Sequence, residues 1–356
     1  MQRALFHWQY WRKNRVQQMK KRYFFGCLIV MVMLTACYFN NVPTHFTSDA
    51  FHRAKTSPIN RISGMATDGN RVVAVSTSGV IAWSDDHGEN WKESGFKDNE
   101  LVSGISFNAV AWADGYYFAG GDGGKAAWSR DGETWSAGVI GPMNPENIHA
   151  VSVGRMRQQL VFVAAGTRGR IAYALNSPEG TWFHVLFTPF GDQEVNGSTE
   201  SVNALAYGKV HGDSVFVAVG DNGKIAIMND FSGNFYGPSA IGTQLPFYGL
   251  TFGNERFIAV GEGATVKISA DPEYYAWNTI RKSSFGMEAF TIIAFAPAFN
   301  YFVMVSGDSI VRFSEYGESW TAANFSGLFE RGISAVVGTK KKIILSGLGG
   351  EIYYSN

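Results

Sequence analysis

One pattern of about 45 residues recurs seven times along this chain of 356 residues. Each copy holds an apolar segment, a turn of Gly, Asp or Asn, a second apolar segment, a Gly-rich turn, a third segment, and a polar turn that ends in an aromatic residue. The first segments are ISGMATD (62–68), FNAVAWAD (107–114), IHAVSVG (148–154), VNALAYG (202–208), FYGLTFG (247–253), TIIAFAP (291–297) and ISAVVGT (333–339). The second are RVVAVSTSG (71–79), YYFAGGDGG (116–124), LVFVAAGTRG (160–169), SVFVAVGDNG (214–223), RFIAVGEGA (256–264), YFVMVSGDS (301–309) and KIILSGLGG (342–350). The third are VIAWS, KAAWS, RIAYAL, KIAIMN, TVKIS, IVRFS and EIYYS.

These segments are rich in β-branched and aromatic residues, which favours strands over helices. Short strands repeating at about 45 residues are typical of propeller blades. We therefore predict an all-β fold, a seven-bladed β-propeller with four-stranded blades over residues 51–356. The seventh unit ends at Asn356 after its third segment, so we expect FHRAK (51–55) to supply its fourth strand. That N-terminal strand would close the last blade and remove two exposed sheet edges.

The N-terminal region predicts export. Lys20, Lys21 and Arg22 precede an apolar run from Tyr23 to Leu34, which is long enough for a signal sequence but short for a membrane span. The run ends in Leu-Thr-Ala-Cys (34–37), which resembles the lipobox of bacterial lipoproteins. The resemblance implies cleavage before Cys37 and attachment of lipid chains such as palmitate to it, while an uncleaved signal anchor is the alternative. We expect a signal peptide over 1–36, with Met19 as the true start, then a lipidated cysteine and tether over 37–50.

Charge and cysteine content limit the partners. Residues 1–36 carry seven basic and no acidic groups, so the rest has 23 basic and 30 acidic residues. An acidic body argues against nucleic acid. The only other cysteine, Cys27, lies in the signal, so the mature chain could form no internal disulfide. The histidines show no metal-ligand spacing, and we predict neither a metal nor a cofactor. We expect a monomeric propeller in the bacterial cell envelope, at the periplasmic or outer-membrane face.

The polar turn after the third segment resembles the Asp-box (BNR) repeat, Ser-x-Asp-x-Gly-x-x-Trp. Three copies supply the residues that we interpret as structural: Ser84, Asp86, Gly88 and Trp91; Ser129, Asp131, Gly132 and Trp135; Ser314, Gly317 and Trp320. Asp oxygens can accept backbone N–H bonds inside such a turn, Gly permits a positive φ, and Trp can cover the blade. The resemblance implies a fold rather than an activity, with this turn facing away from any active site.

A glycan-cleaving enzyme is the alternative function. The Asp-box resemblance suggests a sialidase first, and sialidases carry a Phe/Tyr-Arg-Ile-Pro motif. Its nearest counterpart here is Asn-Arg-Ile-Ser (60–63), which lacks the aromatic residue and the proline. Another glycoside hydrolase could use two carboxylates on one face. Acidic and polar residues do recur in the turn after the second segment. The candidate binding residues of these turns are Asp122, Arg168, Asp221, Asn222, Glu262 and Asp308. Ordinary turn chemistry also explains Asp-Gly and Asn-Gly at these positions, and we prefer that explanation.

Over roughly 60–356 the repeat pattern is also similar to the photosystem II assembly-factor family, which has seven-bladed Asp-box-like propellers. That resemblance implies binding of other proteins through one propeller face and no catalytic residues. The family's arginine-rich surface is replaced here by mixed, slightly acidic turns. We therefore expect a non-catalytic, membrane-anchored scaffold that binds another envelope protein or a glycan.

Overall fold

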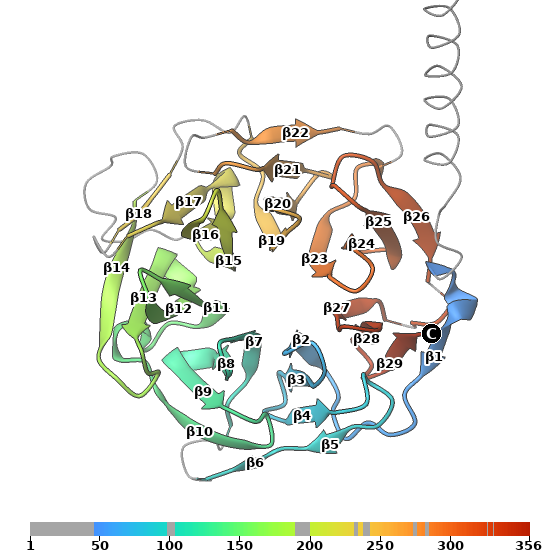
Figure 1. Cartoon of the computed structure of the whole chain (residues 1–356), viewed down its shortest axis with the longest axis horizontal. Coiled ribbons are helices and arrows are strands. Elements are labelled where there is room, and N and C mark those ends of the chain that lie inside the picture. Colours follow the sequence, from blue (N-terminus) through green and yellow to red (C-terminus); the bar gives the residue numbers. More distant parts are fainter. Residues whose placement is uncertain are drawn as a thin grey trace, which may run out of the picture. The chain divides into compact units, whose positions relative to one another are not determined.

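The computed structural model describes residues 46–97, 104–188, 200–230, 234–237, 243–272, 276–281, 285–325, 327–329 and 331–356. Thr47–Asn356 form one compact unit. In this unit seven blades of antiparallel strands surround a central axis, and the first strand of each blade faces that axis (Figure 1). The predicted all-β, seven-bladed propeller with four-stranded blades is confirmed.

The blades are numbered in chain order, and their strands are given from the axis outward. They are blade 1, β2 (Ile62–Thr67), β3 (Val72–Ser76), β4 (Ile81–Ser84), β5 (Lys92–Glu93); blade 2, β7 (Phe107–Ala113), β8 (Tyr116–Gly121), β9 (Lys125–Ser129), β10 (Thr134–Val139); blade 3, β11 (Ile148–Met156), β12 (Gln159–Gly166), β13 (Arg170–Leu175), β14 (Trp182–Thr188); blade 4, β15 (Val202–Val210), β16 (Asp213–Gly220), β17 (Ile225–Met228), β18 (Asn234–Tyr236); blade 5, β19 (Phe247–Gly253), β20 (Arg256–Gly261), β21 (Val266–Ser269), β22 (Asn278–Ile280); blade 6, β23 (Phe290–Ala296), β24 (Tyr301–Ser306), β25 (Ile310–Ser314), β26 (Thr321–Asn324); and blade 7, β27 (Ile333–Gly338), β28 (Ile343–Gly347), β29 (Ile352–Ser355), β1 (Phe51–Arg53).

The N-terminal strand closes the ring as predicted. β1 pairs antiparallel with β29, with Phe51 opposite Ser355 and Arg53 opposite Tyr353. The two ends of the propeller therefore lie in one sheet, and blade 7 gains its outer strand from the start of the unit. Closure pairs the edge of β29, which would otherwise be open to addition of a strand from another chain.

Outer strands also connect neighbouring blades. The short strand β6 (Gly95–Phe96) leaves blade 1 and pairs in parallel with β10 of blade 2. β14 of blade 3 pairs in parallel with β18 of blade 4, so these two blades form one continuous eight-stranded sheet. Neighbouring blades are therefore joined by backbone hydrogen bonds at the periphery, in addition to the packing of their side chains.

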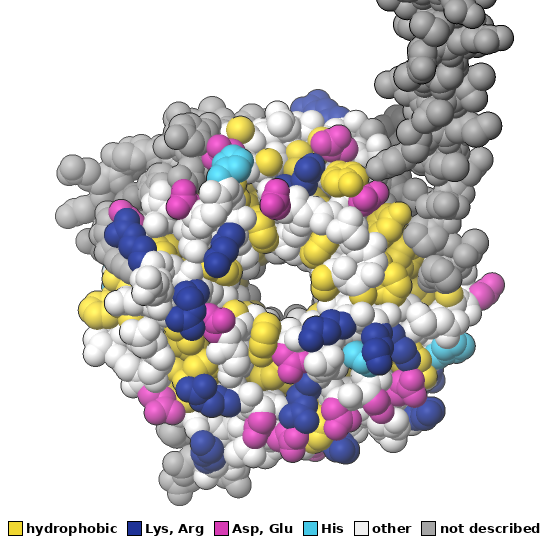
Figure 2. All heavy atoms as spheres, in the orientation of Figure 1, with side chains coloured by type: hydrophobic (Ala, Val, Ile, Leu, Met, Phe, Trp, Pro, Cys, Tyr) yellow, Lys and Arg dark blue, Asp and Glu magenta, His cyan; other side chains and the backbone are white. Residues whose placement is uncertain are grey.

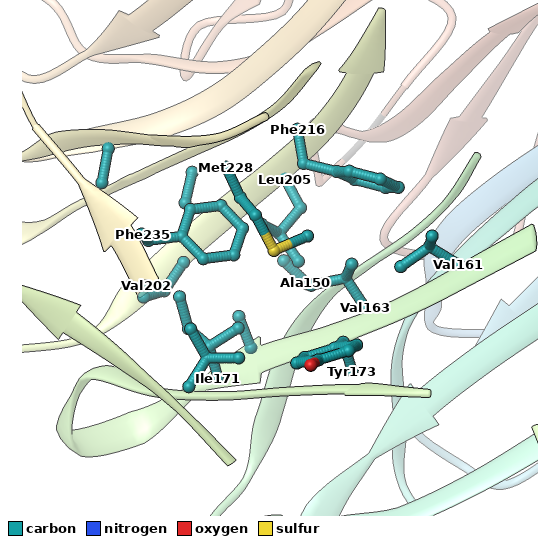
Figure 3. Close-up of a cluster of buried hydrophobic side chains, with 14 of the residues drawn as sticks. Ala150, Val161, Val163, Ile171, Tyr173, Val202, Leu205, Phe216, Met228 and Phe235 are labelled. Atoms are coloured by element: carbon teal, nitrogen blue, oxygen red, sulfur yellow. The ribbon is translucent and has the colours of Figure 1, made fainter. Parts of the chain in front are cut away.

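The core lies between the blades. Figure 3 shows one such layer, in which Val163 and Ile171 of blade 3 pack against Leu205, Phe216 and other side chains of blade 4. Glycines on the inner strands allow the close approach. A Cβ added at Gly154 would lie 2.3 Å from the Tyr207 ring, and one at Gly253 would lie 2.2 Å from the Phe295 ring. Each aromatic ring therefore packs on the glycine backbone of the preceding blade.

The turn between β4 and β5 is held by its own side chains. Asp86 Oδ1 accepts hydrogen bonds from the Ser84 hydroxyl (2.8 Å) and from the backbone N–H of Asn90 (2.9 Å). Gly88 has a φ of +94°, and its carbonyl accepts the buried indole N–H of Trp91 at 3.0 Å. Burial acts to raise the pKa of Asp86, but these hydrogen bonds outweigh burial and hold the pKa below its usual range.

Two further copies repeat this arrangement. In blade 2, Ser129 donates to Asp131 Oδ1 at 2.9 Å, and the indole N–H of Trp135 donates to Gly132 at 3.0 Å. In blade 6, the Gly317 N–H donates to Ser314 Oγ at 2.8 Å, and the indole N–H of Trp320 donates to the Gly317 carbonyl at 2.7 Å. The side-chain hydrogen bonds of these residues lie within their own turns, which agrees with a role in folding.

Candidate binding face

The six candidate residues all lie in turns between the second and third strands of blades 2 to 6. Three of these turns are short 3-10 segments, η3 (Asp122–Gly124), η5 (Thr167–Gly169) and η7 (Asp221–Gly223). Glu262 and Asp308 lie in the corresponding turns of blades 5 and 6. Because successive strands of a blade run antiparallel, these turns open on the side opposite the Ser84–Trp91 turn. We call this side, with its blade-to-blade connections, the rim face.

In two of these turns the central residue is not glycine, although its backbone is in the left-handed conformation. Gly123 has a φ of 64° in blade 2, and the same position is held by Arg168 (φ 56°) in blade 3 and Asn222 (φ 53°) in blade 4. This conformation suits Gly and Asn but costs energy for Arg. Arg168 remains 70% exposed in its side chain, with Glu146 3.5 Å away.

A ring of polar residues lies at the rim-face end of the inner strands. Every inner strand has a β-bulge at its second residue, where the register to the second strand shifts. Each bulged residue is polar, and the seven are Ser63, Asn108, His149, Asn203, Tyr248, Thr291 and Ser334. A bulge reorients a side chain from the sheet pattern, which is a common device near binding sites.

Several bulged residues connect one blade to the next. Ser63 Oγ donates to the Phe107 carbonyl at 2.6 Å, and Asn108 Nδ2 donates to the Ile148 carbonyl at 3.1 Å. Each acceptor is the first residue of the following inner strand. His149 and Asn203 make the corresponding bonds to the backbone of Val202 and Phe247. A continuous series of polar contacts therefore runs from blade 1 to blade 5.

The candidate aspartates belong to this series. Asn108 Nδ2 also donates to Asp122 Oδ1 (2.8 Å), and Asn203 Nδ2 donates to Asp221 Oδ1 (3.0 Å). His149 lies between Asp122 and Asp221 in the chain order of the blades, and the charges of both carboxylates act on its pKa. Desolvation nevertheless dominates and lowers its pKa, although Asp122, Asp221 and the bond to Val202 act to raise it. We expect His149 to be neutral near pH 7.

Glu262 and Asp308 have partners of their own. The Tyr248 hydroxyl donates to Glu262 Oε2 at 2.9 Å, and burial together with this bond raises the pKa of Tyr248. Asp308 accepts from Ser306 Oγ at 2.6 Å and shares a hydrogen bond with Glu288. That bond, followed by burial and the Asp308 charge, raises the pKa of Glu288. The two carboxyl groups are thus in direct contact, nearer than the roughly 5 Å or more that separates a glycosidase pair.

The exposed apolar residues are concentrated on the rim face. Of the seven large hydrophobic residues exposed in the described part of the chain, four lie in its turns and connections or at a strand end beside them. They are Val139, Leu245, Met287 and Leu348, with Met287 84% exposed. Figure 2 shows one face of the ring, which is hollow at its centre and carries interspersed charges of both signs. On the rim face, ion pairs such as Arg168–Glu146 and Lys224–Glu200 accompany the exposed aliphatic side chains.

Sequence reasoning found the rim turns but not the bulged ring. The signal was present, since the second residue of each inner strand is polar within an apolar segment. Three residues that interact with the candidate residues were not predicted from the sequence. Glu146 pairs with Arg168, and Glu288 and Arg312 interact with Asp308. Cys37 lies outside the described residues, as do the predicted signal and most of the tether.

The described residues contain no group of three or more His, Cys, Asp or Glu side chains placed to hold a metal ion. Within the same ranges, no helix has the length and apolarity needed to cross a membrane.

The fold and rim define a seven-bladed β-propeller with a polar ring at one face, and solved propellers are similar to it. A structure described as YCF48 bound to D1 peptide has a TM-score of 0.62 and 14% identity, covering 86% of this chain and 94% of that one. YCF48 from Cyanidioschyzon merolae has a TM-score of 0.63 and 16% identity, covering 86% and 99%. The WD40 propeller domain of Doa1 gives 0.62 and 14%, covering 86% and 95%. No family model and no curated protein matches the chain. At these identities the similarity establishes the fold alone.

Proposed function

We propose that this chain is a non-catalytic, membrane-anchored propeller of the bacterial cell envelope that binds a protein partner on its rim face. The observation that carries the proposal is the character of that face, where Leu245 and Met287 are exposed in a surface that also carries the hydrogen-bonded carboxyl groups of Glu262 and Glu288. Protein interfaces combine apolar contacts with a polar, hydrogen-bonding rim in this way. A flexible side chain such as Met287 adapts to a peptide surface.

The arrangement of the blades supports a scaffold role. The polar bonds between blades fix the inner strands, so the rim turns are presented on a rigid support. Similarity to YCF48, one structure of which is described as bound to D1 peptide, is consistent with peptide binding by such a ring. Because the rim face carries charges of both signs, we expect the partner surface to carry both signs as well.

A photo-crosslinking experiment tests the face. A photoreactive amino acid would replace Leu245 or Met287 on the rim face, and Trp112 or Tyr316 on the opposite face as matched exposed controls. Expressed as the full chain in bacterial cells, the two rim variants should yield the same discrete protein adduct. Equal adducts from both faces, or adducts from the control positions alone, would reject the rim face as the binding surface.

Membrane anchoring is tested separately. The mass of the mature N-terminal peptide should equal that of a chain beginning at Cys37 and carrying lipid. Cys37→Ser should leave the chain unlipidated. A wild-type N-terminal peptide that retains residues before Cys37 would support the uncleaved signal anchor instead.

A further inference from the structure

The N-terminal strand of the propeller begins on the side opposite the rim face. We call this side, which carries the Ser84–Trp91 turn, the Asp-box face. β29 runs from the rim face toward the Asp-box face, and β1 runs antiparallel to it, with Phe51 opposite Ser355. The Asn356 N–H donates to the Ala50 carbonyl at 3.0 Å, beside the C-terminus marked in Figure 1. The chain therefore enters blade 7 at the Asp-box face.

A lysine-rich turn lies beside this entry point. Residues 339–342 (Thr-Lys-Lys-Lys) connect β27 to β28 at the Asp-box face. The N–H of Ile343, the residue after this turn, donates to Ser355 Oγ at 2.9 Å. Ser355 is also the residue that faces Phe51 at the start of β1. The lysines and the point of chain entry are therefore neighbours in blade 7.

Two of these three lysines are exposed at the surface. Lys342 Nζ lies 2.8 Å from Glu89 Oε1 and is half-buried, whereas Lys340 and Lys341 are exposed. In the part of the chain that the structure describes, neither exposed lysine forms an ion pair with a carboxylate. The segment η2 (Ser48–Ala50), which precedes β1, carries a single acidic residue, Asp49. The lysines therefore give the entry point an excess of positive charge.

An apolar turn of blade 6 lies next to the lysines. Residues 297–300 (Pro-Ala-Phe-Asn) connect β23 to β24, carry no charge, and begin with two exposed residues. A Cβ added at Gly338, the last residue of β27, would lie 2.3 Å from the Cα of Ala296, the last residue of β23. The apolar turn and the lysine turn therefore start side by side.

An exposed tyrosine extends this surface. Asn300 Nδ2 donates to Glu315 Oε1 at 3.4 Å, which connects the apolar turn to the turn between β25 and β26. Tyr316 in that turn is 41% exposed. The acidic Glu318 of the same turn pairs with Arg256 at 3.5 Å. Tyrosine, lysine and apolar residues together are typical of surfaces that meet lipid headgroups.

The length of the proposed tether favours contact between this face and a membrane. Thr47, the first residue of the propeller unit, follows Cys37 by ten residues, which can span at most about 36 Å. β27 and β28 hold six and five residues, so blade 7 is about 20 Å deep from one face to the other. Anchoring at Cys37 would bring the rim face to the bilayer only if most of that length ran along the side of the blade.

We propose that the Asp-box face of blades 6 and 7 rests on the membrane surface, where Lys340 and Lys341 contact anionic phospholipid headgroups. Residues 297–299 and Tyr316 lie at the level of the headgroups. The inference rests on the proposed anchoring at Cys37 and deepens it, because it gives the ring an orientation. The rim face is then directed away from the bilayer and is open to a protein partner.

Photo-crosslinking to lipid tests this orientation. A photoreactive amino acid would replace Ala298 on the Asp-box face, and Leu348 or Met287 on the rim face as exposed controls. The full chain, purified from bacterial cells, would be reconstituted in vesicles of phosphatidylcholine and phosphatidylglycerol. Mass spectrometry after irradiation counts phospholipid adducts, and no other protein is present. The Ala298 variant should yield several times more adduct than either rim variant.

A second set of variants tests the lysines. Lys340→Gln and Lys341→Gln together should lower the adduct yield at position 298 at least about fivefold, because each lysine near an anionic surface adds attraction. Arg331→Gln, an exposed cation before β27 at the rim face, is the matched control and should leave the yield unchanged. Thermal unfolding of each variant establishes that it is folded.

Phospholipid adducts that are equal at the three positions, or larger at Leu348 and Met287, would overturn the orientation. An unchanged yield in the double lysine variant would overturn the headgroup contact. The mass of the mature N-terminus, measured before reconstitution, separates these failures from failure of the anchoring itself. A lipidated chain that crosslinks to lipid through its rim face would remove only the inference made here.

Discussion

Phe51 lies directly opposite Ser355 in the sheet of blade 7, and its ring packs edge-on against Phe325 of the connection after blade 6, with centres 5.0 Å apart. One N-terminal residue thus contacts two C-terminal segments. The side chain is 6% exposed, so its contribution is that of a core residue.

Phe51→Ala should therefore destabilise the whole propeller, by about 3–5 kcal/mol, as for a buried Phe elsewhere. The measurement is urea unfolding of the full chain, with the midpoint expected to fall. His52→Ala is the control, because this neighbour in the same strand is exposed and should change stability by less than about 1 kcal/mol. Equal effects of the two substitutions would mean that strand pairing, rather than the Phe51 side chain, closes the ring.

The ring and its closure could be predicted because both follow from patterns local to each repeat. The repeat period of about 45 residues predicts the number of blades. Because the seventh unit lacks its fourth segment, its fourth strand was expected from the N-terminal side of the repeats. The β6–β10 and β14–β18 pairs were not predictable in this way, since they depend on how loops of unequal length run around the periphery.

The candidate site was predicted only in part for a related reason. Turn positions after the second strands follow from sequence, so Asp122, Asp221 and Glu262 were placed on one face. Their partners Asn108, Asn203 and Tyr248 lie 14 to 18 residues away on bulged strands. The polar second residue of each inner strand is visible in every repeat, but its contact with the next blade depends on how the blades pack together.

The Asp86 turn predicts a stability that depends on pH. The folded-state pKa of Asp86 lies below its ordinary value of 3.8, so its stabilisation is present above about pH 4 and is lost as the pH falls through the lower folded-state value. Asp86→Ala should cost about 1–3 kcal/mol at neutral pH. The gap between wild type and variant should narrow below pH 4, measured by urea unfolding at several pH values. A gap that stays constant down to pH 2 would exclude the ionised carboxylate as its source.

Arg168→Gly should stabilise the propeller while altering its rim. Arg168 has a φ of 56°, where Gly123 stands in the corresponding turn of blade 2, so glycine removes a strain of about 1 kcal/mol. Its ion pair with Glu146 is mostly exposed on the arginine side and offsets little of this gain. The thermal midpoint should rise or remain equal, and rim crosslinking should weaken. A clear loss of stability would show that the Glu146 contact is worth more than the backbone strain.

Asn203→Ala tests the polar contacts between blades. Its amide N–H group donates to both Asp221 (3.0 Å) and the Phe247 carbonyl (2.9 Å), so the substitution leaves two acceptors without this donor. We expect a loss of about 1–3 kcal/mol in unfolding free energy. Hydrogen exchange should quicken at the start of β19, while the start of β7, linked by Ser63 instead, serves as the internal control. Unchanged exchange at β19 would argue that the apolar core alone fixes neighbouring blades.

Lys267→Met tests the cost of a buried charge in blade 5. Methionine fills a similar volume without a charge, and replacing a buried cation by an apolar residue is often neutral or stabilising. Wild-type Lys267 has a folded-state pKa below 10.5, so the cost of its charge is fully present below that lowered pKa and is relieved as the pH rises through it toward 10.5. The variant should therefore be at least as stable as wild type at pH 7, by up to about 2 kcal/mol, and its advantage should shrink in alkaline solution. Urea unfolding at pH 7 and pH 10 measures both effects. Should Lys267→Met instead unfold more readily at pH 7, the contacts of the lysine in blade 5, among them its bond to Thr279, would outweigh the cost of its buried charge.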